Sequence, residues 1–175
     1  MLKKFFLLFV AGLFLTASFI NPSAITAQPA ASTDMVQNGS ILPRVFLLGD
    51  FDGTPFEQLK SNYENTLFSA CHNDAETAYF CWMHLLKHLE SFAQQRNYDI
   101  NGVKMWLYVF WNKDGTVAHI AYYLKPNSKF VKTDVLTNLL KSFSETYKLP
   151  LTSDKNYSNY NSAAFPVNVE KPAEK

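Results

Sequence analysis

The stretch GVKMWLYVFWNKDGTVAHIAYYL, residues 102–124, contains two runs of β-branched and aromatic residues. The runs, Val103–Trp111 and Thr116–Leu124, are separated by a short segment that ends in Asp114-Gly115. Asp-Gly between two apolar runs is typical of a β-hairpin, because glycine accepts the positive φ that such a turn requires. The stretch therefore predicts two antiparallel strands joined by a turn, with helices before and after them.

Alternation along the first strand predicts which side chains face the helices, because successive residues of a strand point to opposite faces. The helix-facing set is apolar and consists of Val103, Met105, Leu107 and Val109. The opposite face then carries an aromatic row of Trp106, Tyr108 and Phe110.

The second strand requires one irregularity. Val117 and Ile120 both have the character of core residues although they are three positions apart. A β-bulge near Ala118–His119 reconciles them, because a bulge inserts one extra residue into a strand. It also places a second set of residues beside the aromatic row: His119, Ala121 and Tyr123.

Aromatic side chains on an open sheet face commonly mark a contact surface. We therefore predict a partner-binding site formed by Trp106, Tyr108, Phe110, His119 and Tyr123. The alternative is that this face is covered, either by the N-terminal strand segment, by the polar segment Thr152–Ser162, or by a second copy of the chain in a homodimer that forms through the sheet.

The N-terminus has the order of a secretory signal peptide, predicted to span residues 1–27. Lys3 and Lys4 precede the uncharged apolar run Phe5–Ile20, and Ile25-Thr26-Ala27 forms a cleavage site before Gln28. The alternative is an uncleaved anchor, although the run is shorter than the ~20 residues that a spanning helix needs. We expect a periplasmic or secreted protein with no stable membrane span after cleavage.

The charge balance argues against a nucleic-acid partner. The chain has 16 Lys and Arg, two of which lie in the leader, which leaves 14 against 15 Asp and Glu. Binding to nucleic acid requires a clustered basic face, which a nearly neutral domain does not predict.

The remaining chain is expected to form a flexible linker over 28–43, a single domain over 44–170 and a frayed tail over 171–175. Thr54 is predicted to cap a first helix, whose apolar spacing continues to Ala70. Asn73 is predicted to cap a second helix, which ends near Arg96. Further elements are a strand at Val45–Leu48, a third helix at Thr133–Tyr147, a loop at Thr152–Ser162 and an edge strand at Ala164–Val169.

These elements predict a two-layer α+β fold. A small antiparallel sheet, centred on the hairpin at 103–124, would carry the helices on one face in the order β-α-α-β-β-α-β.

Cys71 and Cys81 are a candidate disulfide, since an exported chain meets an oxidising compartment. On one unbroken helix they would lie ~15 Å apart, which excludes a bond. A turn at His72–Asp74 would bring them together. The alternative is two buried free thiols.

Asp50-Phe51-Asp52-Gly53-Thr54 follows an apolar strand and resembles the first motif of haloacid dehalogenase-type phosphohydrolases. The resemblance implies Asp50 as the nucleophile, Asp52 as the general acid and base, and Mg²⁺ on the phosphate. The other interpretation is a strand-to-helix turn in which Asp and Gly suit the loop. The later aspartates are scattered and supply no acidic pair for a metal, so we expect no catalytic residues and keep the phosphohydrolase as an alternative.

His84 and His88 have the i, i+4 spacing at which two imidazoles can bind one metal ion. They lie opposite the stripe of Leu85, Leu86 and Leu89, among polar residues, which is typical of a solvated helix face. We therefore expect neither a metal nor another cofactor.

Residues 74–169 resemble the C-terminal domain of TonB-type energy transducers. The matching positions are a glycine, an alternating strand, an Asp-Gly turn and a second strand: Gly102, Val103, Met105, Leu107, Val109, Trp111, Asp114, Gly115, Val117, Ile120 and Tyr122. The resemblance implies the order α-β-β-α-β and a non-catalytic exported domain that binds an envelope protein or peptide. Strand addition at a sheet edge is the expected mode. A structural envelope protein without a ligand is the remaining alternative.

Overall fold

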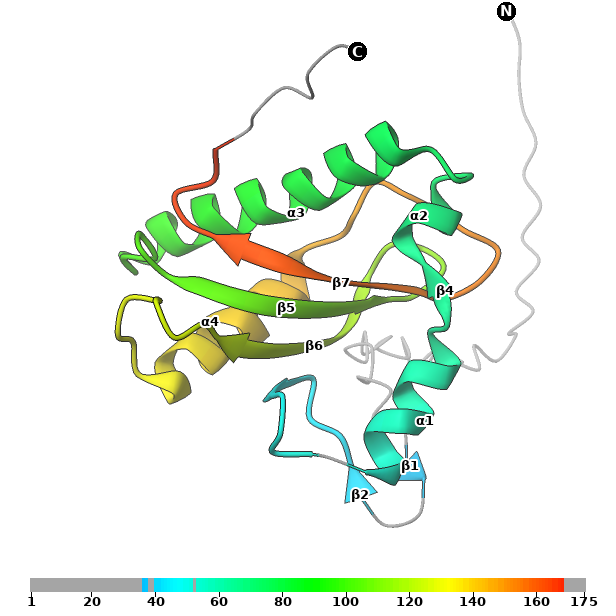
Figure 1. Ribbon diagram of the computed structural model, residues 1–175, viewed down its shortest axis with the longest axis horizontal. Coiled ribbons are helices and arrows are strands. Elements are labelled where there is room, and N and C mark those ends of the chain that lie inside the picture. Colours follow the sequence, from blue (N-terminus) through cyan, green and yellow to red (C-terminus); the bar gives the residue numbers. More distant parts are fainter. Residues whose placement is uncertain (1–35, 38–39, 52, 169–175) are drawn as a thin grey trace, which may run out of the picture. The chain divides into compact units, whose positions relative to one another are not determined.

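The computed structural model describes residues 36–37, 40–51 and 53–168, and Figure 1 shows the arrangement of their elements. The predicted signal peptide, the start of the linker and the C-terminal tail lie outside these residues. The strands are β1 (Val36–Gln37), β2 (Ser40–Ile41), β3 (Val45–Leu47), β4 (Asn65–Thr66), β5 (Lys104–Trp111), β6 (Val117–Leu124) and β7 (Tyr157–Ala164). The helices are α1 (Thr54–Asn62), α2 (Leu67–Ala70), α3 (Ala75–Gln95) and α4 (Thr133–Thr146).

The predicted α+β fold is confirmed, and its centre is the predicted hairpin. Five strands form one sheet in the order β3-β6-β5-β7-β4. The three long strands β6, β5 and β7 are antiparallel, whereas β3 runs parallel to β6 and β4 runs parallel to β7. The sheet is therefore mixed rather than wholly antiparallel.

The predicted bulge is present in β6. Phe110 is opposite His119 and Trp111 is opposite Val117, so that Ala118 is the extra residue. Both Val117 and Ile120 are buried as a result. On the other face, the register places Trp106 opposite Tyr123, as the alternation predicted.

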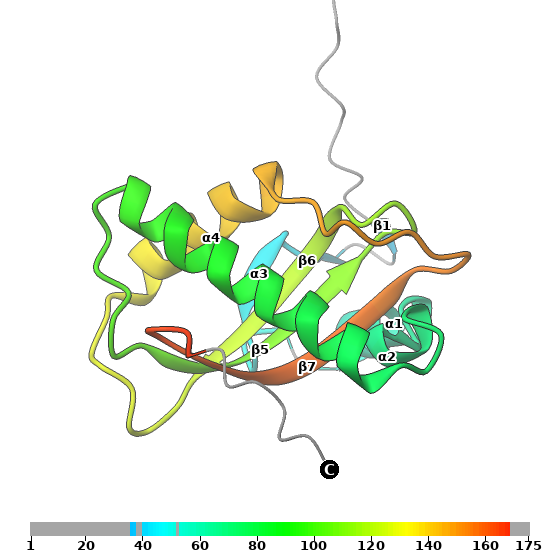
Figure 2. The same cartoon turned by 90° about the horizontal axis from the view of Figure 1, so that it is seen from above.

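Helices cover both faces of the sheet, which corrects the prediction of one covered face. α3 and α4 lie on the same side (Figure 2) and enclose the larger core with the odd-numbered side chains of β5. α1 packs on the opposite face, where Leu59 and Tyr63 contact Phe110 and Ala121 in a second, smaller core. Leu42 belongs to this second core and is buried, so packing begins inside the segment predicted as a linker.

The first predicted helix is broken into three elements. α1 ends at Asn62, β4 follows, and Thr66 then caps α2 by accepting a hydrogen bond from the Ser69 N–H at 3.0 Å. Thr54 does not cap α1, because Gly53 occupies the N-cap position and no side chain caps the helix. Apolar spacing alone could not reveal the break, since Leu67 and Ala70 are buried in both arrangements.

The second helix begins one residue later than predicted. His72 and Asn73 have φ values of 57° and 62°, so they form the turn and Asp74 is the N-cap of α3. The Asp74 carboxylate accepts hydrogen bonds from the N–H groups of Glu76 and Thr77. Hydrogen bonds from Thr77 first, and then from Glu76, lower the pKa of Asp74.

β7 replaces most of the predicted loop, which corrects two predictions at once. The strand spans Tyr157–Ala164, and the segment from 165 onward is not a strand within the described residues. β7 pairs with β5 along its whole length and with β4 only at Tyr157 and Ser158, so the strand begins seven residues before the one predicted at Ala164–Val169. Its sequence, YSNYNSAA, lacks an apolar alternation because only Tyr157 and Ala163 reach the main core.

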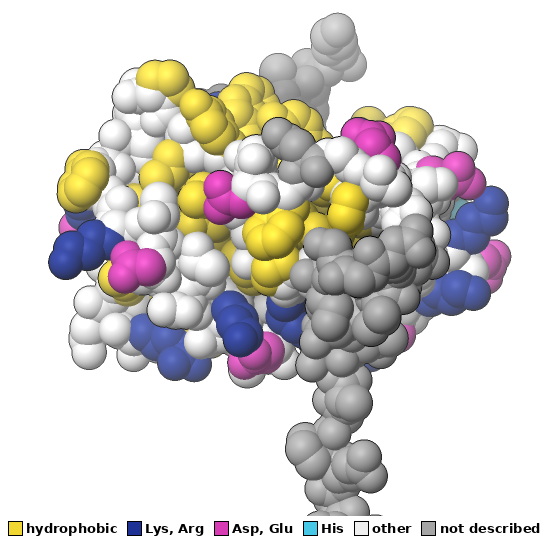
Figure 3. All heavy atoms as spheres, turned by 90° about the horizontal axis from the view of Figure 1, so that it is seen from below, with side chains coloured by type: hydrophobic (Ala, Val, Ile, Leu, Met, Phe, Trp, Pro, Cys, Tyr) yellow, Lys and Arg dark blue, Asp and Glu magenta, His cyan; other side chains and the backbone are white. Residues whose placement is uncertain are grey.

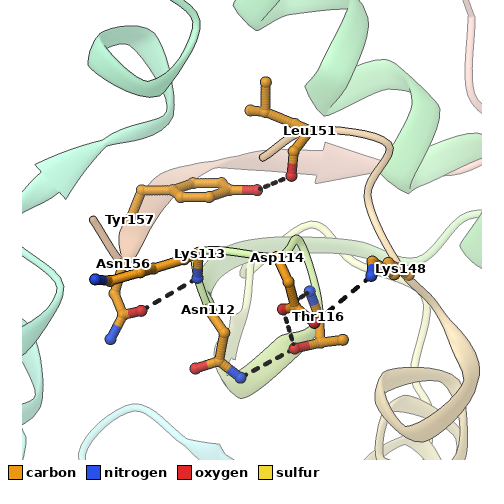
Figure 4. Close-up of polar contacts among 8 residues, drawn as sticks. All are labelled: Asn112, Lys113, Asp114, Thr116, Lys148, Leu151, Asn156 and Tyr157. Carbon is orange, nitrogen blue, oxygen red and sulfur yellow. Dashed lines mark hydrogen bonds and ion pairs between the residues drawn. The ribbon is translucent and has the colours of Figure 1, made fainter. Parts of the chain in front are cut away.

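The turn of the hairpin holds the chain that leads into β7 (Figure 4). Gly115 accepts a hydrogen bond from the Leu149 N–H at 2.9 Å, and Lys113 accepts one from the Ser153 N–H at 2.9 Å. Lys113 also donates its N–H to the Asn156 side chain at 3.2 Å. These hydrogen bonds position the chain before β7 so that Tyr157 pairs with Trp111.

We predict that Gly115→Ala is strongly destabilising. Gly115 has a φ of 87°, and an added Cβ would lie 2.2 Å from the Leu149 carbonyl oxygen and 2.8 Å from that of Leu151. Because both obstacles are backbone atoms, the loss in the free energy of unfolding should exceed about 4 kcal/mol. Urea denaturation measures it.

Gly49→Ala is the matched control, since Gly49 has a φ of 102° but no atom within 4 Å of the added Cβ. Gly49→Ala should lower the free energy of unfolding by only about 1–2 kcal/mol, which is the strain of a left-handed conformation. Equal losses in the two variants would contradict the role assigned to the turn.

Candidate functional site

The predicted binding face lies on the side of the sheet opposite α3 and α4. Figure 3 views the molecule from that side and shows hydrophobic side chains gathered there. Side chains of three adjacent strands contribute, because Trp106 of β5 lies between Tyr123 of β6 and Ser162 of β7, and Tyr108 lies opposite Tyr160.

α1 covers one half of this face. The Phe110 side chain is fully buried, and the rings of Tyr63 and Phe56 lie 5.5 and 6.5 Å from its ring. His119 is also buried, with its Nδ1 3.0 Å from the Pro43 carbonyl oxygen. These two residues were predicted to bind a partner, and their burial removes them from the accessible surface.

The other half of the face is accessible among the described residues. Trp106, Tyr123 and Tyr160 keep 38%, 52% and 50% of their surface exposed, and Tyr108 is half-buried. We name these four residues the aromatic platform. The rings of Trp106 and Tyr160 are stacked at 5.5 Å, and Tyr160 lies 5.4 Å from Tyr108.

Lys125 supplies the positive charge at the platform. Its Nζ lies 4.0 Å from the centre of the Trp106 ring and donates to the Ser162 hydroxyl at 2.6 Å. A cation over an indole ring is electrostatically attracted to it. Lys125 therefore holds Trp106 beside β7 in a defined orientation.

Sequence reasoning missed Tyr160 of the platform and Lys125, which contacts the platform at Trp106. Tyr160 lay in a segment predicted as a loop, so its face could not be assigned. The signal that could have located it is the i, i+3 pair of Tyr157 and Tyr160 in an otherwise polar segment. Their odd spacing would place them on opposite faces of a strand, one in the core and one on the platform.

The outer edge of β7 is open beyond its first two residues. β4 pairs only with Tyr157 and Ser158, and no described strand pairs with the outer side of Asn159–Ala164. The Phe165 N–H donates to the Val103 carbonyl at 3.0 Å, so the odd-numbered residues bond to β5. Because donors alternate along a strand, the N–H groups of Tyr160, Ser162 and Ala164 point away from β5. The Ser162 N–H donates to Asn161 Oδ1 at 2.7 Å, a local bond that an added strand would replace.

This edge lacks the features that usually protect a strand from pairing, which are charged side chains, proline and bulges. Tyr157–Ala164 contains no charged residue and no proline, and its register with β5 is continuous. The opposite edge of the sheet is formed by β3, which is only three residues long. The open edge and the aromatic platform meet at Tyr160.

The other candidate residues are distributed over the molecule. Asp50 is exposed after β3, and Asp52 lies outside the described residues. No group of three or more His, Cys, Asp or Glu that could hold a metal ion occurs among the residues that the structure describes. Cys71 and Cys81 are free thiols, buried and half-buried respectively.

His84 is half-buried rather than fully solvated, which corrects the prediction for this residue, whereas His88 is exposed as predicted. Its Nδ1 lies 2.8 Å from the buried Tyr147 hydroxyl, and its ring lies 3.9 Å from that of the exposed His88. His88 donates from Nδ1 to the His84 carbonyl at 2.9 Å. Burial first, and then the neighbouring His88, lowers the pKa of His84.

No protein family, curated protein or solved structure matches this chain. Within the described part of the chain, none of the helices has the length and apolar character needed to cross a membrane.

We predict that Phe110→Ala and Trp106→Ala separate the covered half of the face from the accessible half. Phe110→Ala leaves a cavity beneath α1 and should lower the free energy of unfolding by about 3–5 kcal/mol. Trp106→Ala should cost no more than about 2 kcal/mol, because its side chain is only partly buried. Chemical denaturation of both variants measures the difference, and a larger loss for Trp106→Ala would refute this division.

We predict that stability decreases as the pH falls below about 6.5, the ordinary histidine value. The pKa of His84 is lowered in the folded protein, so the unfolded chain binds the proton first and unfolding becomes more favourable. The loss levels off once the pH is below the folded pKa. Urea midpoints at about pH 7.5 and about pH 5.5 should differ less in His84→Gln than in the wild type. An unchanged difference would assign the effect to other groups.

Proposed function

We propose that this chain is an exported, non-catalytic domain of the cell envelope that binds an extended segment of a partner protein. The observation that carries the proposal is the open edge of β7 beside the aromatic platform. An extended peptide satisfies the outward N–H and C=O groups of such an edge by adding one strand to the sheet.

The geometry defines what the added strand would contact. Alternate side chains of the partner would point to the platform side of the sheet, next to Tyr160, whose ring is stacked on that of Trp106 one strand further in. These positions favour aromatic or aliphatic residues, because they would bury apolar surface against exposed rings. The main chain of the partner would supply affinity, and the alternate side chains would supply selectivity.

Two features of the sequence support the export and the protein partner. Lys3 and Lys4 before the apolar run Phe5–Ile20 favour secretion. The order α3-β5-β6-α4-β7 is the order α-β-β-α-β that the resemblance to TonB-type C-terminal domains implies.

We predict that Ser162→Pro abolishes peptide binding while Ser162→Ala retains it. Proline removes the outward N–H of residue 162, which donates to Asn161 Oδ1 at 2.7 Å in the unbound chain, without removing a bond to β5. Alanine keeps that N–H but removes the hydroxyl that Lys125 contacts. The probe is a set of linear peptides selected on the wild-type protein from a random display library. Isothermal titration of one selected peptide should show at least a tenfold weaker affinity for Ser162→Pro.

Two controls accompany this experiment. Urea denaturation must show that Ser162→Pro is folded, and sedimentation must show that the wild type is monomeric at the concentration used. Selection of peptides that bind both variants equally would contradict strand addition at β7. A wild-type dimer that Ser162→Pro disrupts would identify a second copy of the chain as the occupant of the edge.

A further inference from the structure

Cys71 and Cys81 are brought together by the turn between α2 and α3. Cys71 is the C-cap of α2, and its carbonyl accepts the Asp74 N–H at 3.1 Å. The left-handed residues His72 and Asn73 reverse the chain, so that α3 returns past the end of α2. Cys81, on the second turn of α3, therefore faces back toward Cys71.

The two thiols share one environment in the main core. Cys71 is 3% exposed and belongs to the core cluster, and Cys81 packs against the same cluster while remaining partly accessible. Burial and the adjacent Cys81 thiol raise the pKa of Cys71 to about 12. Burial, followed by the charges of Cys81 and Cys71, also raises the pKa of Tyr157. The side chains of Cys71 and Cys81 are within hydrogen-bonding reach of each other, so the two sulfur atoms are neighbours in this core.

We infer that Cys71 and Cys81 form a redox-active pair that oxidises to an intramolecular disulfide between the end of α2 and α3. The oxidant is a small-molecule or protein disulfide. In the first exchange, the Cys81 thiolate attacks the external disulfide, which forms a mixed disulfide and releases one external thiol. In the second, the Cys71 thiolate attacks the Cys81 sulfur and releases the other external thiol. Two thiols of the chain lose two electrons and two protons, which the external disulfide gains.

Accessibility sets this order of attack. Cys81 is the more exposed thiol and reaches the external disulfide first. Cys71 is buried and its pKa is high, which disfavours the thiolate that the first exchange requires. Cys71 is instead placed for the second, intramolecular exchange, in which proximity replaces exposure.

The Cys71–Cys81 disulfide would restrain the segment of β4 and α2, and β4 covers the first part of the outer edge of β7. β4 and α2 immediately precede Cys71, and β4 pairs with Tyr157 and Ser158. Joining α2 to α3 would therefore hold β4 on the first two residues of β7 and leave the following residues free.

The experiment treats the folded, reduced full chain with oxidised glutathione at mildly alkaline pH. Iodoacetamide alkylation and tryptic mass mapping then identify the state of each cysteine. We expect one Cys71–Cys81 cross-link per chain, with the intact mass lower by two hydrogen atoms. Thermal unfolding of the oxidised form should occur at a temperature roughly 5–10 °C higher than that of the reduced form.

Two variants make each outcome decisive. Cys71→Ala should stop at a glutathione adduct on Cys81, and Cys81→Ala should react far more slowly, because only the buried thiol remains. Cys81→Ala replaces a partly accessible residue, so it keeps the test valid if Cys71→Ala does not fold. A wild-type chain that stays reduced, retains only a glutathione adduct, or forms cross-links between chains would overturn the inference.

Discussion

The contact between Gly115 and the backbone at Leu149–Leu151 is the constraint on which the rest of the sheet depends. Gly115 accepts the Leu149 N–H, and its missing side chain leaves room for two carbonyl groups. The turn of the central hairpin therefore holds the chain that leaves α4 and directs it into β7. Without this close approach, β7 would have no fixed register beside β5, and neither Tyr160 nor the strand edge would be positioned.

α1 divides the outer face of the sheet into two parts with different roles. Leu59 of the helix and its C-cap residue Tyr63 pack with Phe110 and Ala121 in a second core, which contributes stability. The helix leaves Trp106 uncovered, so the accessible aromatic rings remain on the same face, beside the open part of β7. On one face of β5, Phe110 is therefore buried in the second core, whereas Trp106 remains accessible to a partner.

The hairpin, its bulge, α4 and the placement of Tyr123 beside Trp106 could be predicted because they depend on local alternation and turn chemistry. The break of the first helix and the position of β7 could not, because they depend on partners distant in sequence. β4 exists only because Thr66 lies opposite Ser158, and YSNYNSAA forms a strand only because β5 pairs with it. Phe110 and Trp106 are equivalent in sequence pattern, and only the position of α1 distinguishes them.

Amide hydrogen exchange by NMR tests the open edge of β7 most directly, because it reports each backbone N–H separately. The amides of Asn161 and Ala163 face β5 and should exchange slowly, whereas those of Tyr160 and Ala164 face outward and should exchange rapidly. Such an alternation is the predicted result for the monomer without a partner. Equal, strong protection of all four amides would show that the edge is already paired, and would contradict the account.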